Sequence, residues 1–238
     1  MPKFLDLTQP MSRLTPRSCD HPEVTFKTLR WYSKNGLKTH EISASLHSGT
    51  HIDTSALYFP EGETVDKISL ERLIGMAYFV DCRLPELSPI TGDYLESRAS
   101  NLKTDEMLVL CTGWHHHFLN EEKYVLRAPG LDRSGVEWVA EKRPKAVCSD
   151  SPSPEHILMR SGQWRTLRPD LFPEAPPADL YPRSFGHKTL LPLGILLIEG
   201  LGGEIDQLIG QKAMLYALPA KYQGVEAAPV RAIAVLDD

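Results

Sequence analysis

At positions 47–53 the chain reads His47-Ser48-Gly49-Thr50-His51-Ile52-Asp53, and three potential metal ligands fall at i, i+4 and i+6. The preceding residues 41–46 alternate between polar and apolar side chains, as on a strand whose successive side chains point to opposite faces. On a strand the two histidines and the aspartate would share one face, whereas on a helix the aspartate would point away. Gly49 permits a bulge or the close approach of a ligand. The stretch predicts a metal site on a strand over residues 37–52; solvated polar residues on an edge strand are the alternative.

The composition is that of an ordinary globular protein, with 238 residues, 42% of them hydrophobic and 24% charged. A formal net charge of −5 argues against a nucleic-acid partner, because phosphate binding needs a clustered basic face. The four cysteines form no CxxC pair, which favours buried thiols over disulfides. The first residues lack a basic segment followed by an apolar core, and the longest apolar run, 190–198, is too short to span a membrane. We therefore expect a cytoplasmic protein without a membrane partner.

The remaining residues predict one mixed α/β domain with a large loop. Apolar runs bounded by turn residues predict strands at 4–7, 24–31 (interrupted near Lys27), 76–82, 106–112, 146–148, 195–199, 214–218 and 230–236. Helical spacing predicts helices at 70–74, 91–102, 134–141 and 184–191, with a helical turn at 204–208. Residues 152–183 contain seven prolines, so we expect a lid, an interface arm or a flexible insertion there.

Two further potential ligands lie where apolar structure meets polar residues. His187 is on the predicted helix at 184–191, and Glu199 ends the strand at 195–199, which is otherwise almost wholly apolar. An isolated buried carboxylate is very costly. Glu199 therefore needs a partner, and either a basic side chain or a metal ion would serve.

Together these motifs resemble the "cyclase" family of metal-dependent hydrolases, whose best-known members are bacterial kynurenine formamidase and isatin hydrolase. The resemblance rests on the HxGTHxD stretch at 47–53, Ser-Asp-Ser-Pro-Ser at 149–153, and His187 followed by Glu199, and it covers nearly the whole chain. It implies one hydrolase domain over residues 1–238, a swivelling β/β/α domain with a small barrel-like mixed sheet, interrupted by the proline-rich insertion at about 152–183. It also implies a homodimer or homotetramer.

The resemblance implies that His47, His51 and Asp53 hold one divalent ion and that Asp53 bridges to a second ion, completed by His187 and Glu199. Imidazoles and carboxylates without a thiolate suit Zn²⁺ or Mn²⁺ alike, so either is expected, two per subunit. The implied activity is cleavage of a C–N bond in a small amide, lactam or formamide by metal-activated water. A metal-dependent isomerase, lyase or lactone-acting enzyme and a non-catalytic ligand-binding protein are the alternatives.

The chain departs from the family pattern just after Asp53. The family continues Asp-Ala-Pro-x-His, and this histidine acts as general acid/base, whereas here Leu57 occupies its position and cannot transfer a proton. Metal-activated water could suffice, another group could supply the proton, or hydrolysis could be lost. Tyr58 and the triple histidine 115–117 offer replacements, with His115 or His117 preferred by alternation from the strand. Tyr58 and His115 are the candidate catalytic residues.

Candidate substrate contacts lie in two loops and beside a strand end. Ser18 stands where kynurenine formamidases carry an aromatic residue that stacks on the substrate, so formylkynurenine is a poor prediction. Trp114, after the strand at 106–112, is a candidate substrate-binding residue, with a place in the core as the alternative. In the insertion, four side chains could reach a substrate, the arginines suiting a carboxylate: Trp164, Arg165, Arg168 and Tyr181.

Overall fold

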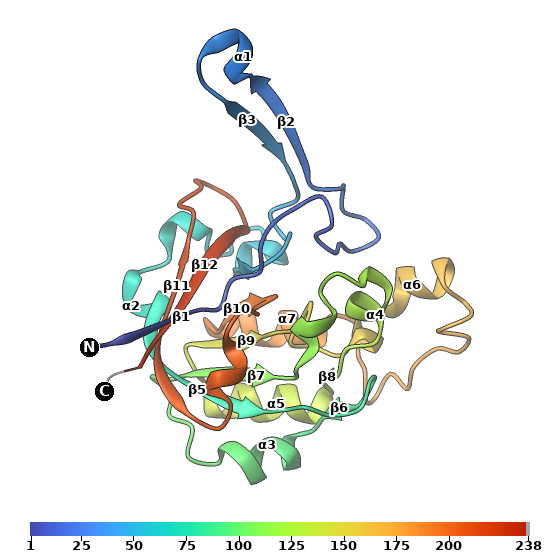
Figure 1. The fold of residues 1–238 in the computed structure, drawn as a ribbon. Coiled ribbons are helices and arrows are strands. Elements are labelled where there is room, and N and C mark those ends of the chain that lie inside the picture. Colours follow the sequence, from blue (N-terminus) through green and yellow to red (C-terminus); the bar gives the residue numbers. More distant parts are fainter. Residues whose placement is uncertain (237–238) are drawn as a thin grey trace.

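The computed structural model describes residues 1–236, apart from the side chains of 161–163. Within these residues seven strands follow one another in a ring, and the last pairs with the first, which closes a barrel (Figure 1). In ring order they are β12 (Ala227–Leu236), β11 (Lys212–Pro219), β5 (Ile74–Asp81), β7 (Met107–Cys111), β9 (Ala146–Ser149), β10 (Leu196–Glu199) and β4 (His51–Asp53). The strands β5, β7, β9 and β10 are parallel and the other pairings are antiparallel. The expected small barrel-like mixed sheet is confirmed.

The barrel separates two apolar cores. On β7, Met107, Val109 and Cys111 point into one core, and Leu108 and Leu110 point into the other, because side chains alternate along a strand. The second core lies under helices on the outer face (Figure 1). These helices are α3 (Gly92–Ala99), α5 (Arg133–Lys142) and α7 (Phe185–Leu190). The buried strand expected at 106–112 thus serves two layers at once.

Short elements complete the fold, and each predicted helix appears within a few residues of its expected place. Strand β1 (Lys3–Asp6) pairs with β12 outside the ring, and β6 (Pro89–Ile90) pairs with β8 (Gly130–Leu131). The remaining helices are α2 (Leu70–Leu73), α4 (Glu121–Leu126), η1 (Ser55–Leu57), η2 (Val65–Lys67), η3 (Trp114–His117), η5 (Leu191–Leu193) and η6 (Ile205–Leu208). Among the helices described, none combines the length and the apolar character needed to cross a membrane.

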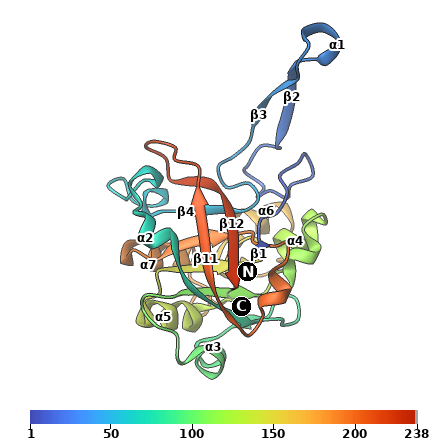
Figure 2. The ribbon, with the colours of Figure 1, turned by 60° about the vertical axis from the view of Figure 1, so that its left-hand side comes forward.

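The single strand predicted over residues 37–52 is wrong. Strand β3 (Thr39–Ser43) pairs only with β2 (Thr25–Arg30), and β4 begins at His51. The interruption expected near Lys27 appears as a register irregularity between Thr28 and Arg30. The chain turns between them at Gly49, whose φ of +68° is a conformation that glycine adopts without steric cost. The hairpin of β2, α1 (Tyr32–Asn35) and β3 projects from the barrel (Figures 1 and 2).

The proline-rich insertion is partly helical. It contains η4 (Ile157–Met159) and α6 (Ser161–Leu167). A third apolar cluster joins it to the segment after β7, and its members include Trp114, Phe118, Tyr124, Ile157 and Phe172. The insertion therefore packs against the segment that carries the triple histidine. The division of the chain into domains stays a prediction.

Candidate metal centre

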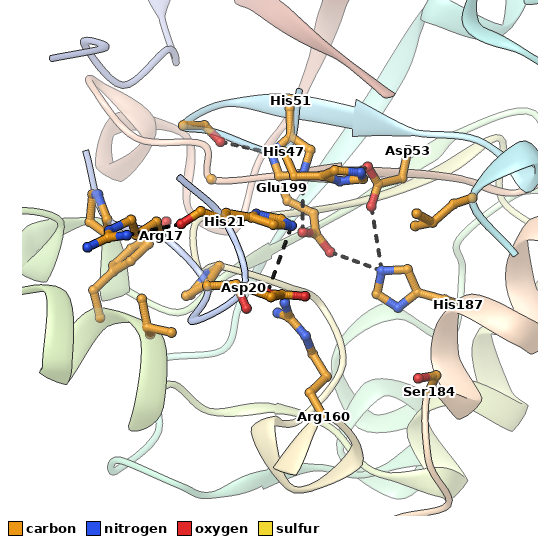
Figure 3. Close-up of a pocket in the computed structure, with 18 of the residues that line it drawn as sticks. Arg17, Asp20, His21, His47, His51, Asp53, Arg160, Ser184, His187 and Glu199 are labelled. Atoms are coloured by element: carbon orange, nitrogen blue, oxygen red, sulfur yellow. Dashed lines mark hydrogen bonds and ion pairs between the residues drawn. The ribbon is translucent and has the colours of Figure 1, made fainter. Parts of the chain in front are cut away.

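The barrel brings all five predicted metal ligands to the wall of one cavity of about 300 Å³ (Figure 3). His51 and Asp53 alternate on β4 and so share a face. Glu199 lies opposite His51 because β10 pairs antiparallel with β4 in that register. His187 comes from α7, and His47 comes from the turn before β4. Strand alternation therefore places His51 and Asp53 on one face. His47 does not lie on the strand, contrary to expectation, and reaches the site through the turn.

The donor atoms form two groups that share Asp53. In one group, Asp53 Oδ1 lies 2.9 Å from His47 Nδ1 and 3.5 Å from His51 Nε2. In the other, His187 Nε2 lies 3.5 Å from Asp53 Oδ2 and 3.5 Å from Glu199 Oε1. Within each group the donor atoms lie within 4.8 Å of one another. A carboxylate with one oxygen in each group has the geometry of a bridging ligand.

Burial and charge make this cluster incomplete without a cation. Four of its atoms are buried without a hydrogen-bond partner: His51 Nε2, Asp53 Oδ1, Glu199 Oε1 and His187 Nδ1, the last of which faces Glu155. A buried polar atom left unsatisfied costs about 1–3 kcal/mol, so the set favours an ion at its centre. The donor set of imidazole nitrogens and carboxylate oxygens fits a divalent cation.

The pKa values in the metal-free cluster reflect the same crowding of charge. Burial lowers the pKa of His51, but Asp53 and Glu199 outweigh it and raise that pKa to about 9. Burial raises the pKa of Glu199, but the neighbouring imidazoles of His187 and His51 bring it down to about 2. The carboxylates are therefore ionised at neutral pH, as ligands of a cation must be.

A second layer of groups orients the imidazoles. His187 Nδ1 lies 3.1 Å from Glu155 Oε1, and Glu155 Oε2 accepts the backbone N–H of Gly186 at 2.9 Å. The Nδ1 of His51 lies 2.9 Å from the carbonyl oxygen of Gly49. His51 Nδ1 is thus hydrogen-bonded and His187 Nδ1 faces a carboxylate, while each Nε2 is presented to the cluster, an arrangement typical of metal-bound histidines.

Sequence reasoning missed Glu155 and a second acidic residue, Glu226. Glu226 Oε1 lies 3.3 Å from His47 Nε2, on the side of that ring away from Asp53. Glu155 follows the proline-rich run 149–154 and belongs to no periodic pattern. Its burial is the only signal that could have singled it out, and burial here comes from packing between distant segments.

Tyr58 lies at the cavity as expected for a catalytic candidate, next to Leu57 in the wall. Its ring centroid is 5.7 Å from that of His187, and Lys188 Nζ lies 5.6 Å from the Tyr58 ring centroid. Ser55 stands at the position of the proline in the family pattern and begins the helix η1. Its Oγ accepts the backbone N–H of Glu63 at 2.8 Å.

The structure does not place His115 or Trp114 among the residues described at the cavity wall. His115 Nδ1 pairs with Asp150 Oδ2 at 2.9 Å, and Trp114 is buried with its indole N–H donating to the carbonyl of Tyr124 at 3.1 Å. Gly113, at φ +73°, turns the chain into η3, so strand alternation ends before His115. Trp114 is a core residue, which was the alternative.

Ser18 and Trp164 do line the cavity, but the expected arginines do not. Arg168 is paired with Asp170 and Glu122 at 2.8 and 2.9 Å, and Tyr181 packs on His156. Three other arginines lie at the wall: Arg17, Arg160 and Arg183. Figure 3 shows Arg160 directed from the insertion toward the ligand cluster. Its charge acts on two carboxylates near the cavity, Asp20 and Glu155.

Comparisons with known proteins agree with this geometry. The Cyclase family model, described as "Putative cyclase", matches residues 5–156. The kynurenine formamidase of Salinibacter ruber (strain DSM 13855 / M31) is 24% identical over 97% of this chain and 96% of its own length. Isatin hydrolase A from Labrenzia aggregata, solved with benzyl benzoate, has a TM-score of 0.82 at 20% identity and covers 100% of this chain and 94% of its own.

A third likeness concerns a solved structure described as a potential metal-dependent hydrolase with cyclase activity. It has a TM-score of 0.72 at 21% identity and covers 100% of both chains. At such identities the solved structures establish a shared fold. The family model spans well over half of the 238 residues and includes the 47–53 stretch, and this chain therefore belongs to the Cyclase family.

Proposed function

We propose that this protein is a divalent-metal-dependent hydrolase that cleaves a C–N bond in a small amide, lactam or formamide. One observation carries the proposal: Asp53 divides its two oxygens between two groups of buried ligands at a cavity wall. The likeness to proteins named kynurenine formamidase and isatin hydrolase supports this class of reaction. Zn²⁺ or Mn²⁺, two per subunit, are the proposed ions.

In this proposal His47, His51 and Asp53 hold one ion, and Asp53, His187 and Glu199 hold the other. Such ions supply Lewis-acid chemistry, which polarises a carbonyl and makes water a stronger nucleophile. Glu155 and the carbonyl of Gly49 keep the two imidazoles in the orientation that ligation needs. A volume of about 300 Å³ suits a small substrate.

We assign the proton step to Tyr58. A departing amide nitrogen needs a proton, and the hydrocarbon side chain of Leu57 has no acidic proton. Tyr58 is the neighbouring residue in the same wall, and its hydroxyl can both donate and accept a hydrogen bond.

We infer that the substrate carries an anionic group. Arg17 is engaged by Glu23 at 3.2 Å and by the carbonyl of His21 at 3.0 Å, whereas Arg160, in the same wall, makes no salt-bridge contact among the described side chains and acts on Asp20 and Glu155 through its charge. An arginine with free N–H groups directed into a cavity recognises a carboxylate in two-point fashion. The insertion thus contributes to substrate selection through Arg160.

The proposal is tested by loading the protein with Zn²⁺ or Mn²⁺ and assaying amides, lactams, formamides and lactones, each as a carboxylate-bearing and a neutral compound. We expect hydrolysis that is lost on chelation, with the carboxylate-bearing amides preferred. His51→Ala should lose bound metal and at least about 10³-fold in kcat/KM, because it removes a ligand from the cluster. His40→Ala, an exposed residue of β3, is the matched control. Full activity in His51→Ala would overturn the proposal.

Lactone hydrolysis is a second candidate, favoured by Leu57. An alkoxide leaves with less help from an acid than an amine does, so the loss of a proton-donating side chain harms lactone cleavage less. The same assay separates the two candidates. Cleavage of lactones without cleavage of matched lactams would select the second.

A further inference from the structure

A second group of potential ligands lies outside the cavity, where η3 meets η6. Consecutive histidines on η3, His115 and His116, face Asp206 of η6. His116 Nε2 is 2.8 Å from Asp206 Oδ2, and His115 Nε2 is 3.5 Å from the same oxygen. The three donor atoms lie within 4.8 Å of one another, and none of the three residues is among those at the cavity wall.

His115 is held in the orientation that a metal ligand requires. Asp150 accepts the backbone N–H groups of Thr112 and Gly113, each at 2.8 Å, and faces His115 Nδ1 at 2.9 Å. Nδ1 therefore carries the proton and its N–H donates a hydrogen bond to Asp150, which leaves a lone pair on Nε2. A carboxylate behind a histidine in this way fixes the tautomer and raises the basicity of the ligating nitrogen.

The Nε2 of His115 is buried and has no hydrogen-bond partner. The His115 side chain is 5% exposed, whereas His116 and Asp206 are 62% and 46% exposed. The site therefore has one rigid buried ligand and two that solvent can reach, which leaves an entry path for an ion. Arg83, the basic residue near Gly113, is neutralised by two contacts with Asp81 at 2.9 and 2.7 Å.

We propose that His115, His116 and Asp206 form a separate site for a divalent transition-metal ion, with Zn²⁺ as the best match. Two imidazole nitrogens and one carboxylate oxygen, with solvent in a fourth position, are a tetrahedral zinc donor set. The ion would link η3, which follows β7, to η6, which follows β10. A protonated His115 paired directly with Asp206 is the competing arrangement.

The test is a Co²⁺ titration of the full chain followed by visible absorption, with Zn²⁺ displacement, in the parent protein and in an Asp53→Asn background. In both backgrounds, His116→Ala and Asp206→Asn should each remove one equivalent of bound ion, or weaken it by at least about tenfold. His117→Ala is the matched control, because His117 belongs to the same segment but packs on Trp114. Both test positions are exposed, so the variants are expected to fold.

The measurement is a difference in stoichiometry and needs no enzymatic activity. The proposed second metal site is therefore tested separately from the proposed hydrolysis and from metal binding in the cavity cluster. Unchanged Co²⁺ binding in His116→Ala and Asp206→Asn would overturn the proposal and select the ion pair. So would equal losses in His117→Ala.

Discussion

At the scale of single residues, position 57 marks how this chain differs from the family pattern. Leu57 lies in the cavity wall and packs against the outer core, so the place of a proton-transferring side chain is filled by an apolar one. The ligand positions around it keep their donor atoms. In the proposed reaction the change would therefore affect proton transfer and leave the cluster of potential ligands in place.

Leu57→His should raise kcat for amide hydrolysis by about 10²-fold, the lower end of what a general acid or base contributes, and should change lactone hydrolysis much less. The comparison is of steady-state rates for one lactam and the matching lactone. Leu57→Met, similar in volume but unable to transfer a proton, should give no gain. An unchanged lactam rate in Leu57→His would show that the proton path does not pass through position 57.

At the scale of elements, the junction between β4 and β10 holds the two halves of the cluster together. Gly200 directly follows Glu199 and adopts φ +69°, and a Cβ there would lie 2.6 Å from the carbonyl oxygen of Gly49. The Oγ1 of Thr50 donates to the carbonyl of Gly200 at 2.6 Å. The turn that carries His47 is therefore in backbone contact with the end of β10.

Gly200→Ala should lower the free energy of unfolding by at least about 2 kcal/mol, since a methyl group would add a backbone clash to the cost of positive φ, and should weaken metal binding. Gly210→Ala is the control, because Gly210 has φ +80° but open space around its Cβ; it should cost only about 1 kcal/mol. Urea unfolding of the metal-free proteins and Zn²⁺ titration measure both effects. Equal losses in the two variants would contradict the role given to the junction.

At the scale of the whole molecule, the hairpin of β2 and β3 projects without a core of its own (Figure 2). It exposes several large apolar side chains, namely Leu29, Trp31, Tyr32 and Ile42. An isolated two-stranded hairpin is only marginally stable in water, and exposed apolar groups gathered on one projection indicate an interface. These features support the expectation of a homodimer or homotetramer.

A variant with Trp31→Lys and Ile42→Lys should therefore have a lower molar mass in solution than the parent, as measured by light scattering after size-exclusion chromatography. Two buried charges would disfavour an apolar interface. Leu119→Lys, at an exposed leucine outside the hairpin, should leave the molar mass unchanged. A monomeric parent, or a double variant that associates as the parent does, would refute the hairpin interface.

The type and rough place of most elements follow from the sequence, because strand and helix periods are local properties. The apolar run at β7 and the amphipathic pattern of α5 are examples. The sequence also supplied the ligand candidates, since residue chemistry is visible without a fold. The barrel was expected from family resemblance alone, because no local pattern encodes closure between β4 and β12.

How these residues meet depends on the packing of segments that are far apart in the chain. The turn at Gly49 separates His47 from the strand β4, and the turn at Gly113 directs His115 toward Asp150. Glu155 and Glu226 joined the cluster, and Arg160 joined the cavity wall, through packing of segments far apart in the chain. Such contacts depend on the pairing register of β10 with β4 and on the path of each loop, and side-chain alternation describes neither.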